Sequence, residues 1–199
     1  MERLKQRGHS AKIAMEVCNF QDQDKVKAIL ERYDFDYLIG SVHFVAGWGF
    51  DASAVQEEFS RRPLQEIYDA YASEAEKLCA SGLYDVLGHP FNLRVYKVLP
   101  DFDVTPYLER VARAMKKADM AVDINTGTLY RYPIAEISPY PDFMAVAADY
   151  DLPVITSSDA HEPEDCGAYI DEAIAYAKTY GYDKQLYFSR RDRKFVKLG

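Results

Sequence analysis

Short apolar runs alternate with longer amphipathic runs along this chain, and the alternation is what most limits its fold. Apolar, β-branched runs predict strands, and apolar residues at helical spacing predict the helices between them. The predicted strands lie at residues 12–18, 36–43, 84–89, 120–125 and 153–161. They recur at intervals of very roughly 30 residues, which is typical of βα units around a parallel sheet.

Proline or aspartate at the start and glycine near the end mark several of the predicted helices. Asp22 or Asp24 begins the first, whose apolar stripe extends to Tyr33, and Pro63 and Gly82 bound the second. Further helices are predicted after residues 105, 141 and 169, a long loop at 126–141, and two short closing strands at 186–188 and 194–198.

An open doubly wound sheet and a closed barrel share this pattern of elements. Polar residues that end strands favour the barrel, because barrel enzymes build their sites at the carboxyl ends of the strands. No linker or low-complexity segment interrupts the pattern, so we expect one domain over residues 1–199. The residues that end strands are His43, His89, Asp159 and His161.

Charge and composition narrow the function classes. The formal net charge of −8 argues against a nucleic-acid-binding surface, although a small basic pocket for an anionic substrate remains compatible with it. No apolar run is long enough to cross a bilayer, and the polar first residues lack the core of a secretion signal, so we expect a cytoplasmic protein with no membrane partner. The three cysteines are widely spaced and form no CxxC pair, which favours neither disulfides nor a thiolate zinc site.

Asp159 and His161 predict a metal site at the end of the fifth strand. In an extended segment, residues two apart point to the same side, so this carboxylate and this imidazole would converge. Such a pair suits a divalent ion such as zinc, manganese or iron. The alternative is a strand-to-loop junction at which the aspartate caps a turn.

Three of the four histidines strengthen the metal hypothesis. A single histidine at a strand end is usually structural, but His43, His89 and His161 occupy equivalent places, and Glu16 lies inside the first strand. Unpaired ionisable groups there cost several kcal/mol, and a shared metal would offset that cost. His9 lies in a polar segment before the first predicted strand, and we expect it to be exposed to solvent.

Several motifs in order resemble the polymerase and histidinol phosphatase (PHP) family, in particular its histidinol-phosphate phosphatase branch. They cover nearly the whole chain from about residue 10 onward. The motifs are Met15-Glu16-Val17, Gly40-Ser41-Val42-His43-Phe44, Asp85-Val86-Leu87-Gly88-His89-Pro90, Ile124-Asn125-Thr126 with Arg131, and Ser158-Asp159-Ala160-His161.

The resemblance implies a distorted seven-stranded (βα) TIM-like barrel with up to three divalent metals. It implies hydrolysis of L-histidinol phosphate to L-histidinol and phosphate in histidine biosynthesis. It also implies that Glu16 bridges two metals, that His43 and His89 join it on one of them, and that Asp159 and His161 hold the others.

The sequence departs from that family in several respects, and the largest concerns the first strand. The family has an HxH pair in its first strand, and none precedes Glu16. A complete α/β barrel has about 250 residues, so we expect a barrel that lacks its N-terminal units. Such a chain would be a poor catalyst or none, and could self-associate through the uncovered edge of the barrel.

A small phosphorylated substrate requires a cationic partner. Arg131 is the first candidate because a guanidinium binds two phosphate oxygens at once, and Arg190 and Arg191 are second candidates. Tyr130, Tyr132 and Tyr140 can line the pocket or pack the loop. Alternatives are hydrolysis of another small phosphate ester or nucleotide, and an inactive remnant that binds metal.

Overall fold

The central element is an open parallel sheet. The computed structural model describes Arg7 and residues 11–199, so the expectation for His9 lies outside the described residues. The sheet has five strands in chain order, β1 (Ala14–Cys18), β2 (Tyr37–Ser41), β5 (Val86–Leu87), β6 (Ala121–Asn125) and β7 (Val154–Ser157). All neighbouring pairs are parallel, which confirms the predicted βα units.

The described residues do not close the predicted seven-stranded barrel. β1 and β7 form the two edges of the sheet, and five strands are too few, since a closed barrel filled by side chains takes about eight. The α/β class is therefore confirmed, and the closed architecture is not formed by this part of the chain.

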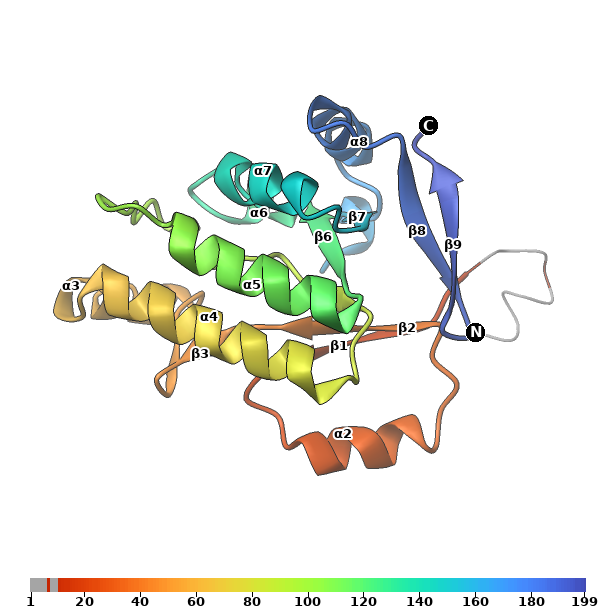
Figure 1. Cartoon of the computed structure of the whole chain (residues 1–199), viewed down its shortest axis with the longest axis horizontal. Helices are drawn as coiled ribbons and strands as arrows, with labels where there is room; N and C mark the ends of the chain where they lie inside the picture. Colours follow the sequence, from red (N-terminus) through yellow and green to blue (C-terminus); the bar gives the residue numbers. More distant parts are fainter. Residues whose placement is uncertain (1–6, 8–10) are drawn as a thin grey trace.

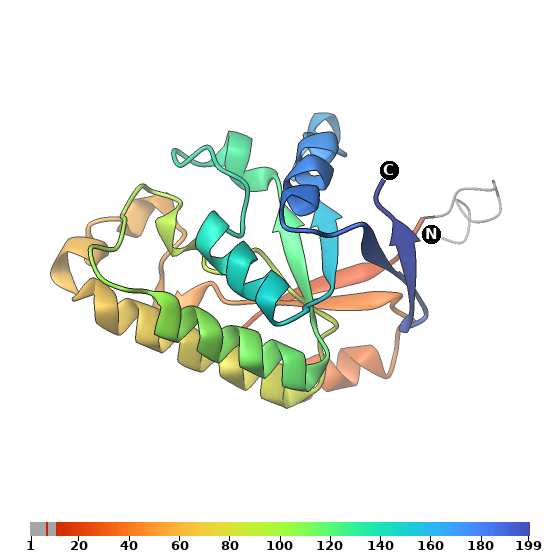
Figure 2. The same cartoon turned by 45° about the horizontal axis from the view of Figure 1, so that its top comes forward.

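The longer helices cover one face of the sheet, and the short helices α3 and α6 lie in loops. The helices are α2 (Gln23–Leu30), α3 (Glu58–Arg61), α4 (Leu64–Ser81), α5 (Thr105–Ala118), α6 (Gly127–Arg131), α7 (Pro141–Asp149) and α8 (Ile170–Thr179). Of these, α4, α5 and α7 lie next to one another over the sheet (Figures 1 and 2). Among the described helices, we find none whose length and apolar character would let it span a bilayer.

Local sequence explains where these helices begin and end. Asp22 caps α2 by accepting hydrogen bonds from two backbone N–H groups of its first turn. Gly82 ends α4 with φ of 66°, a left-handed conformation that glycine adopts without strain. Two predictions were wrong: α2 ends at Leu30 before Tyr33, which is exposed, and the predicted loop at 126–141 contains α6.

Short elements fill the loops after the strands. β3 (Phe44–Val45) and β4 (Trp48–Gly49) form a small antiparallel hairpin that follows β2. Single 3-10 turns lie at Ser53–Val55, Asn92–Arg94 and Pro163–Asp165. These segments stand at the carboxyl ends of the parallel strands, where the predicted site residues also lie.

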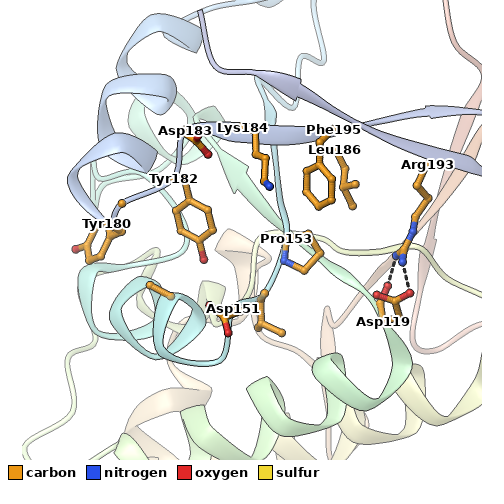
Figure 3. A pocket seen from close by; sticks show the side chains of 13 residues that line it. Asp119, Asp151, Pro153, Tyr180, Tyr182, Asp183, Lys184, Leu186, Arg193 and Phe195 are labelled. Atoms are coloured by element: carbon orange, nitrogen blue, oxygen red, sulfur yellow. Dashed lines mark hydrogen bonds and ion pairs between the residues drawn. The ribbon is translucent and has the colours of Figure 1, made fainter.

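The antiparallel hairpin of β8 (Lys184–Ser189) and β9 (Asp192–Lys197) covers part of the other face. Adjacent strand residues point to opposite faces, so Leu87 packs in the helix-side core while Val86 joins a second cluster with Leu186 and Phe188 of β8. Beside this hairpin lies a cavity of about 630 Å³, lined in part by Lys184 and by the Asp119–Arg193 ion pair (Figure 3).

We predict that Phe188→Ala lowers the free energy of unfolding by about 3–5 kcal/mol, because it empties a buried position between the hairpin and the sheet. Phe195→Ala is the matched control in the same hairpin: Phe195 is 55% exposed and Phe188 only 3%. The control should cost about 1 kcal/mol or less. Urea denaturation measures both, and equal losses would show that the hairpin does not cover the sheet.

Candidate metal centre

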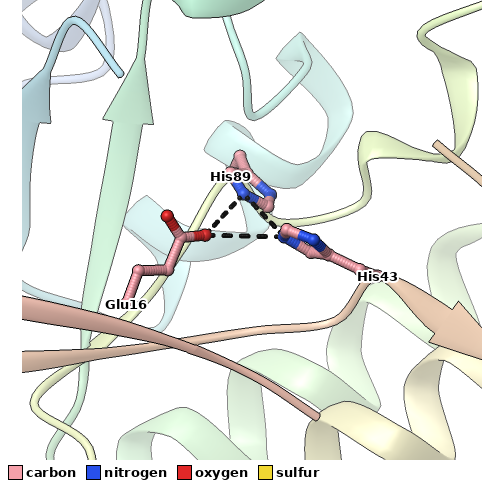
Figure 4. Close-up of side chains that lie close together, drawn as sticks. All are labelled: Glu16, His43 and His89. Carbon is pink, nitrogen blue, oxygen red and sulfur yellow. Dashed lines mark hydrogen bonds and ion pairs between the residues drawn. The ribbon is translucent and has the colours of Figure 1, made fainter. Parts of the chain in front are cut away.

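Three predicted ligands meet at the carboxyl ends of neighbouring strands. Glu16 lies in β1, His43 follows β2 and His89 follows β5 (Figure 4). Nε2 of His89 lies 3.1 Å from Glu16 Oε1 and 3.2 Å from Nε2 of His43, and the latter lies 3.4 Å from the same carboxylate oxygen. One ligand atom of each residue is within 4.8 Å of the others.

A close approach between β2 and β5 brings the two imidazoles together. A Cβ atom at Gly88 would lie 2.2 Å from Ser41 Oγ and 2.9 Å from a methyl group of Ile39, so only glycine fits. His89 then turns into the site with φ of 28°. Its backbone N–H donates to the Asp123 carboxylate at 3.1 Å, which holds that turn in place.

Charge within the cluster is strongly coupled. Burial opposes ionisation of Glu16, but the neighbouring imidazoles of His43 and His89 outweigh it and hold the pKa of Glu16 well below its usual range. Burial would favour neutral His89, yet the Glu16 carboxylate raises the pKa of His89 to about 9. A divalent ion has to displace that proton, since an imidazole binds metal in its neutral form.

Asp159 and His161 reach the same cavity by a different route from the one predicted. β7 ends at Ser157 and Asp159 has φ of 50°, so the argument from an extended strand was wrong. The two still lie close together, with His161 Nδ1 3.8 Å from Asp159 Oδ1 and 2.9 Å from its carbonyl oxygen. The His161 side chain is 60% exposed.

One cavity of about 230 Å³ unites the five predicted ligands with Arg131. Arg131 ends α6, and its Nη1 donates to Asp159 Oδ2 at 2.6 Å and to the Asp159 carbonyl at 3.2 Å. Gly127 allows this approach, because a Cβ there would lie 2.9 Å from the Asp159 Cβ. The lining residues are Glu16, His43, Asp51, His89, Asn92, Arg131, Tyr132, Asp159 and His161.

Arg190 and Arg191 do not line this cavity. They form the turn of the β8–β9 hairpin, near the amino ends of the parallel strands. The backbone N–H of Arg190 donates to Asp36 just before β2, and Arg191 pairs with Asp85 just before β5. The structure therefore separates the second candidates for phosphate binding from the predicted metal ligands.

Three residues near the ligands were not singled out from the sequence. Asp51 and Asn92 line the cavity, and Asp123 is buried beneath it. Tyr132 lines the cavity, which is one of the two outcomes considered for it. Asp123 accepts from Ser157 Oγ at 2.6 Å and Asn125 Nδ2 at 3.1 Å, and burial raises its pKa. A carboxylate inside an apolar strand was the available signal, as it was for Glu16.

Fold and cavity together define an α/β protein whose parallel strands carry a carboxylate and imidazole cluster at their carboxyl ends. Residues 1–127 match the model of the protein family described as "PHP domain". A curated protein of Deinococcus radiodurans named "Probable histidinol-phosphatase" is 34% identical over 157 residues, which cover 78% of this chain. The chain belongs to the PHP domain family.

The more distant relatives agree with that assignment. A second "Probable histidinol-phosphatase", of Clostridium acetobutylicum, is 21% identical over 182 residues. That match covers 87% of this chain and 69% of the length of the Clostridium protein. The crystal structure of histidinol phosphate phosphatase from Lactococcus lactis, complexed with zinc, L-histidinol and phosphate, has the same fold, with a TM-score of 0.72 at 18% identity. That match covers 97% of this chain and 76% of the other. The chain spans 59% of the length of the Deinococcus protein.

We predict that Asp123→Ala lowers the free energy of unfolding by about 2–4 kcal/mol, because two buried donors and the half-buried Ser157 hydroxyl lose their acceptor. The matched control is Asp69→Ala, which removes a carboxylate that is 62% exposed from its ion pair with Arg110. That change should cost about 1 kcal/mol or less. Chemical denaturation compares the two variants, and a mild effect at Asp123 would mean that the network does not hold His89.

Proposed function

We propose that the protein is a metal-dependent phosphomonoesterase, a histidinol-phosphatase that hydrolyses L-histidinol phosphate to L-histidinol and phosphate. The observation that carries the proposal is the cluster of Glu16, His43 and His89, which opens into the cavity that also holds Asp159 and Arg131. The named activity of the Deinococcus relative supports the choice of substrate.

The donor set fits zinc, manganese or iron. Glu16, His43 and His89 offer one carboxylate and two imidazole ligands, which is enough for an ion with a position left open to water. Asp159 and His161 would serve further ions, up to three in all. When bound, divalent ions lower the pKa of water and neutralise charge on phosphoryl oxygens, so no side-chain nucleophile is needed.

Arg131 would bind the phosphate. Its hydrogen bonds to described residues leave from Nη1 and go to Asp159, and the residue lines the cavity from the end of α6. A guanidinium has five N–H donors in a planar fork, which matches two phosphate oxygens. The guanidinium carbon lies 5.5 Å from the Tyr132 ring centroid, which helps to hold its plane.

The size of the cavity supports a small substrate. About 230 Å³ is below the common range of about 300–1,000 Å³ for ligand pockets. Other small phosphate esters and nucleotides are the alternatives to test, and the net charge of −8 counts against a polymer. We also infer that the five-stranded sheet is part of the distorted seven-stranded barrel of the family, in one domain.

A phosphate-release assay on the purified chain tests the function. We expect slow turnover of L-histidinol phosphate with added manganese or zinc, less with nucleoside monophosphates, and none with a chelator or in His89→Ala. Turnover that survives the chelator would rule out the mechanism. If zinc raises the melting temperature of the wild type but no substrate turns over, the chain is the inactive metal-binding alternative.

We predict that Arg131→Lys weakens the affinity for substrate and for inorganic phosphate roughly tenfold or more, because lysine keeps the charge but loses the fork. Arg190→Lys is the matched control, since Arg190 lies at the amino ends of the strands and should leave both affinities unchanged. Competition by phosphate and the KM for substrate measure the effect. Equal behaviour of the two variants would remove Arg131 from the phosphate site.

A further inference from the structure

Asp51 lies behind His43, on the side of the imidazole that faces away from the cluster. Nε2 of His43 faces Glu16 at 3.4 Å and His89 at 3.2 Å, while Nδ1 lies 3.5 Å from Asp51 Oδ2. We propose that Asp51 is a positioning residue that holds the His43 ring in the tautomer whose Nε2 is free to bind a metal. This inference rests on the proposed metal-dependent function.

The β3–β4 hairpin delivers Asp51 to this place. The chain leaves His43, turns back through the pairs Phe44 with Gly49 and Val45 with Trp48, and returns with the Phe50 N–H donating to the His43 carbonyl at 3.2 Å. The Phe50 side chain is fully buried. The hairpin thus brings the Asp51 carboxylate back to the imidazole of His43, the residue that precedes β3.

Two further contacts restrain both partners. The Tyr96 hydroxyl donates to the Asp51 carbonyl at 2.6 Å, which fixes the backbone after the hairpin. The Asn19 Oδ1 accepts from the backbone N–H groups of His43 and Phe44, each at 3.1 Å. The backbone is therefore anchored by hydrogen bonds at both Asp51 and His43. These anchors keep the carboxylate next to the imidazole.

A carboxylate at Nδ1 has a defined effect on a ligand imidazole. A neutral imidazole carries one proton on either nitrogen, and an acceptor at Nδ1 keeps the proton there and the lone pair on Nε2. Such partners orient the ring and make it a better ligand, and their loss costs 10- to 100-fold in metal affinity. The 3.5 Å distance is long for a hydrogen bond, as is common before a ligand is bound.

His89 provides the internal contrast. Its Nδ1 is buried and has no hydrogen-bond partner within the described part of the chain, although its backbone is anchored on Asp123. Of these two histidines, His43 is the one whose Nδ1, the ring nitrogen that points away from the cluster, faces a carboxylate. Asp51 should act through His43 alone, and this separates it from a direct ligand, which would act whether or not His43 is present.

Zinc affinity, measured by competition with a chromophoric chelator, tests the inference in a double-mutant cycle. We expect Asp51→Ala to weaken zinc binding 10- to 100-fold. Asp51→Asn should lose less, because its amide oxygen can still accept from Nδ1. In a His43→Ala background, Asp51→Ala should cause no further loss. Melting curves of the zinc-free variants serve as the folding control.

Nitrogen-15 NMR of the histidine rings in the zinc-free protein, at mildly alkaline pH, is the second readout. We expect a proton on Nδ1 of His43 in the wild type and a shift toward the other tautomer in Asp51→Ala. Zinc affinity unchanged by Asp51→Ala, or an equal loss in both backgrounds, would overturn the inference. A wild type that binds no zinc would contradict the proposed function, and the ring tautomer would still decide the role of Asp51.

Discussion

The parallel pairing of β2 with β5 is the contact on which the site depends. The Gly88 N–H donates to the Gly40 carbonyl at 3.0 Å and extends the ladder beyond the two paired residues of β5. No side chain larger than hydrogen fits at Gly88, so the carboxyl ends of the two strands come close enough for His43 and His89 to face each other at 3.2 Å. The register of β1 against β2 then places Glu16 beside them.

Electrostatics explains why such an arrangement calls for a cation. Glu16, Asp51, Asp123 and Asp159 surround two imidazoles in a small space, and Arg131 is the guanidinium among the residues that line the cavity. Without a metal, the cluster holds its charge balance by keeping His89 protonated and by pairing Arg131 with Asp159. Divalent ions would replace the first of these arrangements and compete with the second.

Much of the fold followed from the periodicity of apolar residues. The five parallel strands and the helices after them were predicted within a few residues, because each buries one face or both and therefore carries a regular pattern. The described strands form an open sheet that is not closed into a barrel, and the extended geometry predicted at Asp159 and His161 was wrong. Both concern how a strand ends or whether edges meet, and long-range packing decides these features.

For the site, the sequence by itself determined the residue types and their places in or after the strands, which led to Glu16, His43, His89, Asp159 and His161. The resemblance to the PHP family led to Arg131. The roles of all six residues remain predictions. Only the tertiary structure decided that these residues share one cavity, that Arg190 lies at the opposite ends of the strands, and that Asp51 stands behind His43. The physical reason is that a strand pattern records which face is buried. It does not record which loop returns to contact which side chain, because hairpin geometry and the packing of residues such as Phe50 determine that contact.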